Sequence, residues 1–187
     1  MTRFRHDGAG ASGRRRSLVV GLAACASGGA DAQLALLAAL RSAERAGASI
    51  RFFGPEALRD LPQIPTDLER ALRQATGFLV AAQAWDGAAP AAARALFAGL
   101  DAIGLDGRPV GFLVSGADWQ KPAEARAELE RLAAAIGGRP SPASLTLPPG
   151  THFTACSVCT DPALGRDLEQ LGRSLAASPA YALSAPD

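Results

Sequence analysis

The chain alternates short, mostly apolar runs with longer segments in which apolar residues recur every three or four positions. The first pattern is typical of strands buried on both faces of a parallel sheet, and the second of amphipathic helices. Strands are predicted over residues 17–23, 49–53, 76–82, 109–114 and 143–147. Helices are predicted over residues 31–46, 66–74, 90–103, 122–136 and 162–176.

Several element ends carry local signals. Thr66 with Glu69 three residues later forms a capping box, which predicts Thr66 as the N-cap of its helix. Asp161 directly before Pro162 predicts the start of the last helix. Residues 57–65 contain two prolines and predict an irregular connection.

Strands and helices that alternate in this way predict one α/β domain, a doubly wound three-layer sandwich with a five-stranded parallel sheet. We expect the domain to span residues 17–177, with a flexible basic tail over residues 1–16 and a flexible tail over residues 178–187. Ligands of such sheets bind at the carboxyl ends of the strands. The loops after the first, third and fourth predicted strands therefore form the candidate site.

The first of these loops lies in segment 14–40, where a strand, a loop of small residues and a helix follow one another. A helix N-terminus in this position offers backbone N–H groups to a phosphate. A second interpretation is an exported lipoprotein, because Arg15-Arg16 precedes an apolar run and residues 22–25 resemble a lipobox with Cys25 as the lipidated residue. Cleavage before Cys25 would remove the first predicted strand, so we favour the folded strand.

The spacing of these elements resembles that of the flavodoxin-like NAD(P)H-dependent FMN reductase family, over residues 17–176. The similar stretches are Val19-Val20-Gly21, RDLPQIP over residues 59–65, Trp85-Asp86-Gly87, and GGRPSPASLTLP over residues 137–148. The resemblance implies a flavodoxin-like fold and bound FMN. It also implies hydride transfer from NAD(P)H through the flavin to a flavin, quinone or other small electron acceptor.

The resemblance further implies which residues bind the cofactors. They are Cys25, Ser27, Gly28 and Gly29 in the first loop, Gln83, Ala84, Trp85, Asp86 and Gly87 in the second, and Ser115, Gly116 and Trp119 in the third. Trp85 or Trp119 would stack on the flavin ring, or would instead anchor its own loop. No catalytic acid or base is expected, because the flavin itself carries the hydride.

The first loop departs from the family pattern G-x-S-G-S-x-R. Gly21 matches, but Ala23, Ala24, Cys25 and Ser27 stand where the family has Ser, Gly, Ser and Arg. Each lost charge-assisted phosphate contact is worth about 1.5–3 kcal/mol, and Asp31 would repel a phosphate nearby. A second hypothesis therefore stays open, a degenerate flavodoxin-like binding or assembly module without tightly bound FMN.

The last predicted loop contains His152, Cys156 and Cys159 at a spacing that metal ligands can have. Structural zinc needs four ligands, and in a flavodoxin-like strand order Cys25 would lie roughly 14 Å away. Unreactive loop thiols and a redox or metal site both remain open interpretations. Ser115 has no glycine two residues before it and no histidine to activate it, which disfavours a hydrolase.

The amino-acid composition of the chain argues against several classes of partner and site. A net charge of +1 disfavours nucleic acid, and two histidines leave little room for a histidine-based triad or a multi-histidine metal site. No apolar run reaches the roughly 20 residues of a membrane span. We therefore expect a cytoplasmic protein that acts on a small molecule, and the family resemblance is compatible with a homodimer.

Overall fold

Parallel strands form the sheet in the order β2-β1-β3-β4-β5, and a short strand β6 also pairs with β4. The computed structural model describes residues 17–25, 30–58, 65–84, 91–151, 153–154 and 157–178, so nearly all of both predicted tails lies outside the described residues. The strands are β1 (Leu18–Ala24), β2 (Ser49–Phe53), β3 (Gly77–Ala84), β4 (Pro109–Gly116), β5 (Arg139–Pro140) and β6 (Leu145–Thr146). The helices are α1 (Ala30–Arg45), the 3₁₀ helix η1 (Pro55–Leu58), α2 (Thr66–Gln74), α3 (Ala91–Asp101), α4 (Gln120–Ala135) and α5 (Pro162–Ala176).

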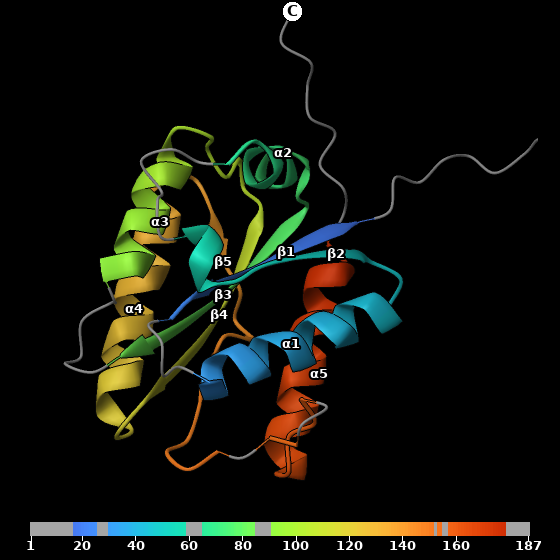
Figure 1. Ribbon diagram of the computed structural model, residues 1–187, viewed down its shortest axis with the longest axis vertical. Coiled ribbons are helices and arrows are strands. Elements are labelled where there is room, and N and C mark those ends of the chain that lie inside the picture. Colours follow the sequence, from blue (N-terminus) through green and yellow to red (C-terminus); the bar gives the residue numbers. More distant parts are fainter. Residues whose placement is uncertain are drawn as a thin grey trace, which may run out of the picture.

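The sheet lies between two layers of helices, as the sequence predicts (Figure 1). Alternate residues of each strand point to opposite faces, which explains why both faces are apolar. Val19, Ala23 and Leu79 pack with α1 and α5 on one face. Val20 and Phe78 pack on the other face with α2, α3 and α4. The predicted doubly wound α/β class is therefore confirmed.

The fifth strand differs from its prediction. Instead of one strand over residues 143–147, the structure has β5 and β6, both parallel to β4 and separated by four residues. Within the gap the Ser144 hydroxyl accepts a hydrogen bond from the Phe112 N–H of β4 (3.1 Å) and donates one to the Ser141 carbonyl (2.8 Å). Pro142 in this gap has no N–H to offer a ladder. A side chain thus replaces the missing backbone partner.

The two predicted helix caps have different outcomes. The Thr66 capping box is wrong, because Pro65 is the N-cap of α2 and the cap makes no side-chain hydrogen bond. Glu69 instead accepts two hydrogen bonds from Arg73, at 2.8 and 3.0 Å, on the exposed side of the helix. The cap of α5 is confirmed, since the Asp161 carboxylate accepts hydrogen bonds from the N–H groups of Ala163 and Leu164.

Strand β1 occupies a central position, which bears on the lipoprotein interpretation. It pairs with β2 on one side and with β3 on the other, and Val19, Val20 and Leu22 are fully buried. Cleavage before Cys25 would remove this strand and separate β2 from the rest of the sheet. No helix in the described ranges is long and apolar enough to cross a bilayer.

Helices α1 and α5 lie side by side and approach closely at Gly172 (Figure 1). A Cβ atom at Gly172 would lie 2.2 Å from the Ala39 carbonyl oxygen and 3.0 Å from the Ala43 nitrogen. The Ser42 hydroxyl donates a hydrogen bond to the Glu169 carbonyl across the same contact (3.1 Å). Only glycine fits at this helix crossing, so Gly172 fixes how α1 and α5 are packed.

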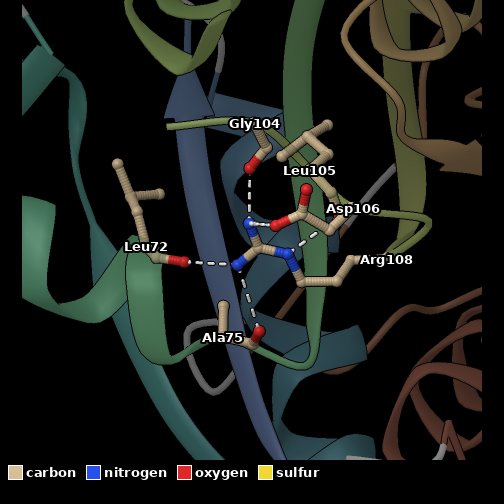
Figure 2. Close-up of polar contacts among 6 residues, drawn as sticks. All are labelled: Leu72, Ala75, Gly104, Leu105, Asp106 and Arg108. Atoms are coloured by element: carbon tan, nitrogen blue, oxygen red, sulfur yellow. Dashed lines mark hydrogen bonds and ion pairs between the residues drawn. The ribbon is translucent and has the colours of Figure 1, made fainter. Parts of the chain in front are cut away.

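Arg108 is a buried cation at the amino end of the sheet, directly before β4. Figure 2 shows its guanidinium among main-chain carbonyls, where it donates to Leu105 (2.9 Å), to Leu72 (2.8 Å) and Ala75 (3.3 Å) at the end of α2, and to Gly104. The guanidinium also lies 5.1 Å from the centre of the Phe78 ring. Burial lowers the pKa of Arg108, while the carboxylate of Asp106 opposes that shift. Arg108 therefore ties α2 to the turn before β4.

Candidate functional site

The carboxyl ends of β1, β3 and β4 lie at one edge of the sheet. The register pairs Ala24 with Ala82, Ala82 with Val114, and Ala84 with Gly116, so these strands end almost level with one another. The three candidate loops start at this edge. Their predicted site residues Ser27, Gly28, Gly29, Trp85, Asp86 and Gly87 lie outside the described residues.

Gln83 and Ser115 are neighbours across the ends of β3 and β4. Each is two residues beyond a residue of the α1/α5 core face, Ala81 and Leu113 respectively, so both side chains belong to that face. The Gln83 Oε1 and Ser115 Oγ atoms are buried, and neither has a hydrogen-bond partner anywhere in the described part of the chain. Ser115 as a whole is only 7% exposed.

An unpartnered buried polar group costs about 1–3 kcal/mol, so two at one point of a core need a physical reason. A bound ligand that crosses the ends of β3 and β4 supplies one, because its own donors and acceptors can replace the missing partners. Gln83 is a hydrogen-bond acceptor through Oε1, and Ser115 can both donate and accept. The pair therefore suits an uncharged ligand that carries hydroxyl or ring N–H groups.

The side chain of Cys25, the residue directly after β1, is buried in the core. Cys25 is 4% exposed and its thiol donates to the Ala81 carbonyl at 3.5 Å. Burial raises the pKa of the Cys25 thiol to about 12, which keeps it neutral at physiological pH. Any contact from Cys25 to a ligand would come from its backbone.

Ala84 and Gly116 end the two strands and have packing roles. Ala84 is fully buried in the core face that contains α4. A Cβ at Gly116 would lie 2.7 Å from the Cγ atom of Pro122 and 2.8 Å from the Ala84 carbonyl oxygen. Glycine at 116 is thus required for α4 to lie against the strand ends, whether or not a ligand is bound.

The third loop places an aromatic ring in solvent at this edge. Trp119 is 62% exposed and directly precedes α4. Asp118 accepts a hydrogen bond from the Lys121 N–H (2.8 Å), and its carboxylate also lies 3.9 Å from the Lys121 ammonium. Because the indole is not part of a core cluster, it is available to stack on a planar ligand. An indole that is 62% exposed does not fit the alternative that Trp119 anchors its own loop.

The cysteine-containing loop lies before α5. Phe153 and Cys159 form an antiparallel bridge, and Ser157 at its tip has a φ of 57°. His152 and Cys156 lie outside the described residues. Cys159 is a free, partly buried thiol, and the strand order places β3 and β4 between β1 and β5. Among the residues described, no cluster of three or more His, Cys, Asp or Glu side chains could hold a metal.

Comparison with known proteins places the fold. No family model matches the chain, and no curated protein matches it. Several solved structures share the fold, including an oxidoreductase from Corynebacterium diphtheriae with 13% identity and a TM-score of 0.67, over 88% of this chain and 97% of that one. A WrbA-like flavodoxin from Agrobacterium tumefaciens has 13% identity and a TM-score of 0.65, over 86% and 95% of the two chains.

A flavodoxin from Streptococcus pneumoniae TIGR4 is also similar, with 16% identity and a TM-score of 0.63, over 86% of this chain and 99% of that one. At such identities the likeness concerns the fold. The protein thus has a flavodoxin-like α/β fold, as the resemblance in its sequence predicts.

The residues at the strand ends fit the ring and the hydroxylated chain of an FMN molecule better than its phosphate. The unpartnered Gln83 and Ser115 and the exposed Trp119 suit the ring and its hydroxylated chain. The phosphate would require the N-terminus of α1, where Asp31 stands in the first turn. An acidic side chain stabilises a helix start but disfavours an anion bound there.

Proposed function

We propose that this protein is a flavin-binding oxidoreductase that passes hydride from NAD(P)H through the flavin to a flavin, quinone or other small acceptor. The observation that carries the proposal is the buried, unpartnered pair Gln83 and Ser115 at the carboxyl ends of β3 and β4. The flavodoxin-like fold supports it, because ligands of such sheets bind at this edge. One structure with the same fold is a flavone reductase, with a TM-score of 0.64 and 14% identity over 85% of this chain and 62% of that one.

When bound, a flavin supplies the hydride chemistry itself, and the protein supplies position and surroundings. In the proposed complex Gln83 and Ser115 bond the polar groups of the flavin from the α1/α5 side of the sheet. Trp119, which directly precedes α4 at the same edge, would stack on the ring and shield one of its faces from water. The buried thiol of Cys25 stays protonated and takes no part. A cytoplasmic location and a homodimer are further parts of this proposal.

Absorption and fluorescence of the purified protein test the proposal. We expect either a flavin spectrum in the protein as isolated, or quenching of tryptophan fluorescence when FMN or riboflavin is added. The Trp119→Phe variant should retain the fold, since residue 119 is mostly exposed, and should lose most of the quenching that arises from the third loop. A colourless protein whose fluorescence changes with neither flavin refutes the proposal.

The same titration decides on the second function, a binding or assembly module without a flavin. Asp31 at the start of α1 and the absence of any lysine or arginine from residues 17–40 favour that alternative, since both weaken phosphate binding. A folded protein that binds neither flavin, but is stabilised by another planar small molecule or by a protein partner, would support it.

A further inference from the structure

The N-terminus of α1 offers a phosphate its backbone N–H groups but little positive charge, and an acidic residue in the first turn opposes that charge. A helix N-terminus is equivalent to roughly half a positive charge, whereas a phosphate monoester carries about 1.5 to 2 negative charges at pH 7. Asp31, in the first turn of α1, adds a full negative charge at the same point, and it is exposed rather than paired with a buried cation. Between Ala24 and Ala30 the sequence offers one hydroxyl, that of Ser27, and no cation.

The first cations that follow the other two strands in the sequence are already paired. Lys121 after β4 lies 3.9 Å from the carboxylate of Asp118. Arg94, in the first turn of α3 after β3, lies 3.5 Å from the carboxylate of Glu128 on α4. Neither therefore brings a net positive charge to the edge of the sheet, and a dianion there would have to compete with these carboxylates.

The second, independent observation is the neutral pair at the strand ends. Ser115 is more than nine-tenths buried and its Oγ atom is unpartnered, and the unpartnered atom of Gln83 beside it is an acceptor oxygen. An acceptor oxygen repels phosphate oxygens but accepts a hydrogen bond from a hydroxyl. The hydroxylated ribityl chain of a flavin carries such donors and no charge.

We propose that this site recognises a flavin by its ring and hydroxylated chain and not by its terminal phosphate, so that riboflavin binds as tightly as FMN. This inference rests on the proposed flavin-binding function. On this inference, dephosphorylated flavin can exchange freely at the site. The lack of cations in the first loop then indicates a ligand without a phosphate, and not a site that has lost flavin binding.

Parallel titrations with riboflavin and FMN, followed by flavin fluorescence at low salt, test the inference. We expect nearly equal dissociation constants for the wild-type protein. The Asp31→Asn variant should tighten FMN binding by about two- to fivefold, because it removes one charge near the phosphate, and should leave riboflavin binding unchanged. The matched control is Glu44→Gln, which removes the same charge near the far end of α1, about 20 Å away along the helix, and should change neither constant.

The outcomes separate the inference from the proposed function. Even one charge-assisted hydrogen bond to the phosphate would make FMN bind more than about tenfold tighter than riboflavin. A preference of that size overturns the inference and leaves the flavin-binding function in place. Failure of both flavins to bind overturns the function and the inference together. A ratio below ten, with an effect of Asp31→Asn confined to FMN, supports both.

Discussion

Replacement of Ser115 by alanine should stabilise the ligand-free protein, which is unusual for a buried hydrogen-bonding residue. The Ser115 hydroxyl is buried and unpartnered in the described part of the chain, so its removal relieves a desolvation cost and breaks no bond. Ser144→Ala is the matched control, because that hydroxyl is equally buried but makes two hydrogen bonds, to Phe112 and Ser141. The two substitutions are chemically identical and should act in opposite directions.

The expected magnitudes follow from hydrogen-bond energetics. Ser115→Ala should raise the free energy of unfolding by about 1 kcal/mol, the lower end of the cost of an unpartnered buried group. Ser144→Ala should lower it by about 1–3 kcal/mol, since the buried Phe112 N–H loses its partner while the Ser141 carbonyl keeps its bond from the backbone N–H of residue 144. For a domain of this size each kcal/mol corresponds to a shift in Tm of roughly 2–4 °C.

The assay is urea unfolding monitored by circular dichroism without flavin, followed by flavin titration of the same variants. If Ser115 contacts the ligand, Ser115→Ala should weaken flavin binding by about 1–1.5 kcal/mol, which is roughly five- to tenfold. Ser144→Ala should leave the affinity unchanged. A loss of stability in Ser115→Ala equal to that in Ser144→Ala would show that Ser115 has a structural partner, and an unchanged flavin affinity would remove it from the site.

Three further predictions concern the scaffold. Gly172→Ala should lower the free energy of unfolding by about 2–3 kcal/mol, because the new Cβ meets the α1 backbone. Gly165→Ala on the same helix should raise it by about 0.5–1 kcal/mol, because the Cβ there would meet nothing closer than 4.0 Å. Equal effects of the two substitutions in urea unfolding would contradict the packing argument. Arg108→Met should lower the free energy of unfolding by about 3 kcal/mol, since the carbonyls of Leu72 and Gly104 lose the guanidinium as a donor. Arg73→Met breaks an exposed ion pair and should change stability by less than about 0.5 kcal/mol. A mild effect of Arg108→Met would show that water replaces the guanidinium. Because the pKa of the Cys25 thiol is raised from 9.0 to about 12, its contribution to stability is complete below about pH 9 and is lost as the pH rises toward 12. Cys25→Ala should therefore lose less stability than the wild type between about pH 8.5 and about pH 10.5. An equal loss in the two proteins would exclude burial of the thiol as the cause.

The sheet could be predicted because its strands are buried on both faces. Residues 18–24 and 77–84 are almost continuously apolar, and only a parallel sheet between two helical layers buries such runs completely. The helix bounds could be predicted because apolar residues recur every three or four positions only in those segments. The split of the fifth strand could not be predicted, because it depends on the Ser144 side chain taking the place of a backbone partner for Phe112.

The roles of single polar residues were harder to predict from local patterns. Thr66 satisfies the letters of a capping box, yet the N-cap is Pro65, one residue earlier in the chain, and the cap makes no side-chain hydrogen bond. Arg108 carries no local signal of burial, because its partners are main-chain carbonyls from two different segments. Cys25 did carry a signal: it follows Val19 and Ala23 on alternate positions of β1, and these residues face α1.

Gln83 and Ser115 show where sequence and structure together say more than either alone. In the sequence each is the only hydrogen-bonding side chain of an otherwise apolar strand, at or next to its last residue, which marks the strand end but not a partner. The register of β3 and β4 brings the two side chains to one face of the sheet. Because both polar atoms are buried there without a partner, each carries an uncompensated desolvation cost. Because a ligand that bonds both groups also relieves their desolvation cost, ligand binding and folding stability are coupled through the same two atoms. Flavin should therefore raise the Tm of the wild type by more than that of Ser115→Ala, even though the variant is the more stable protein when no ligand is present.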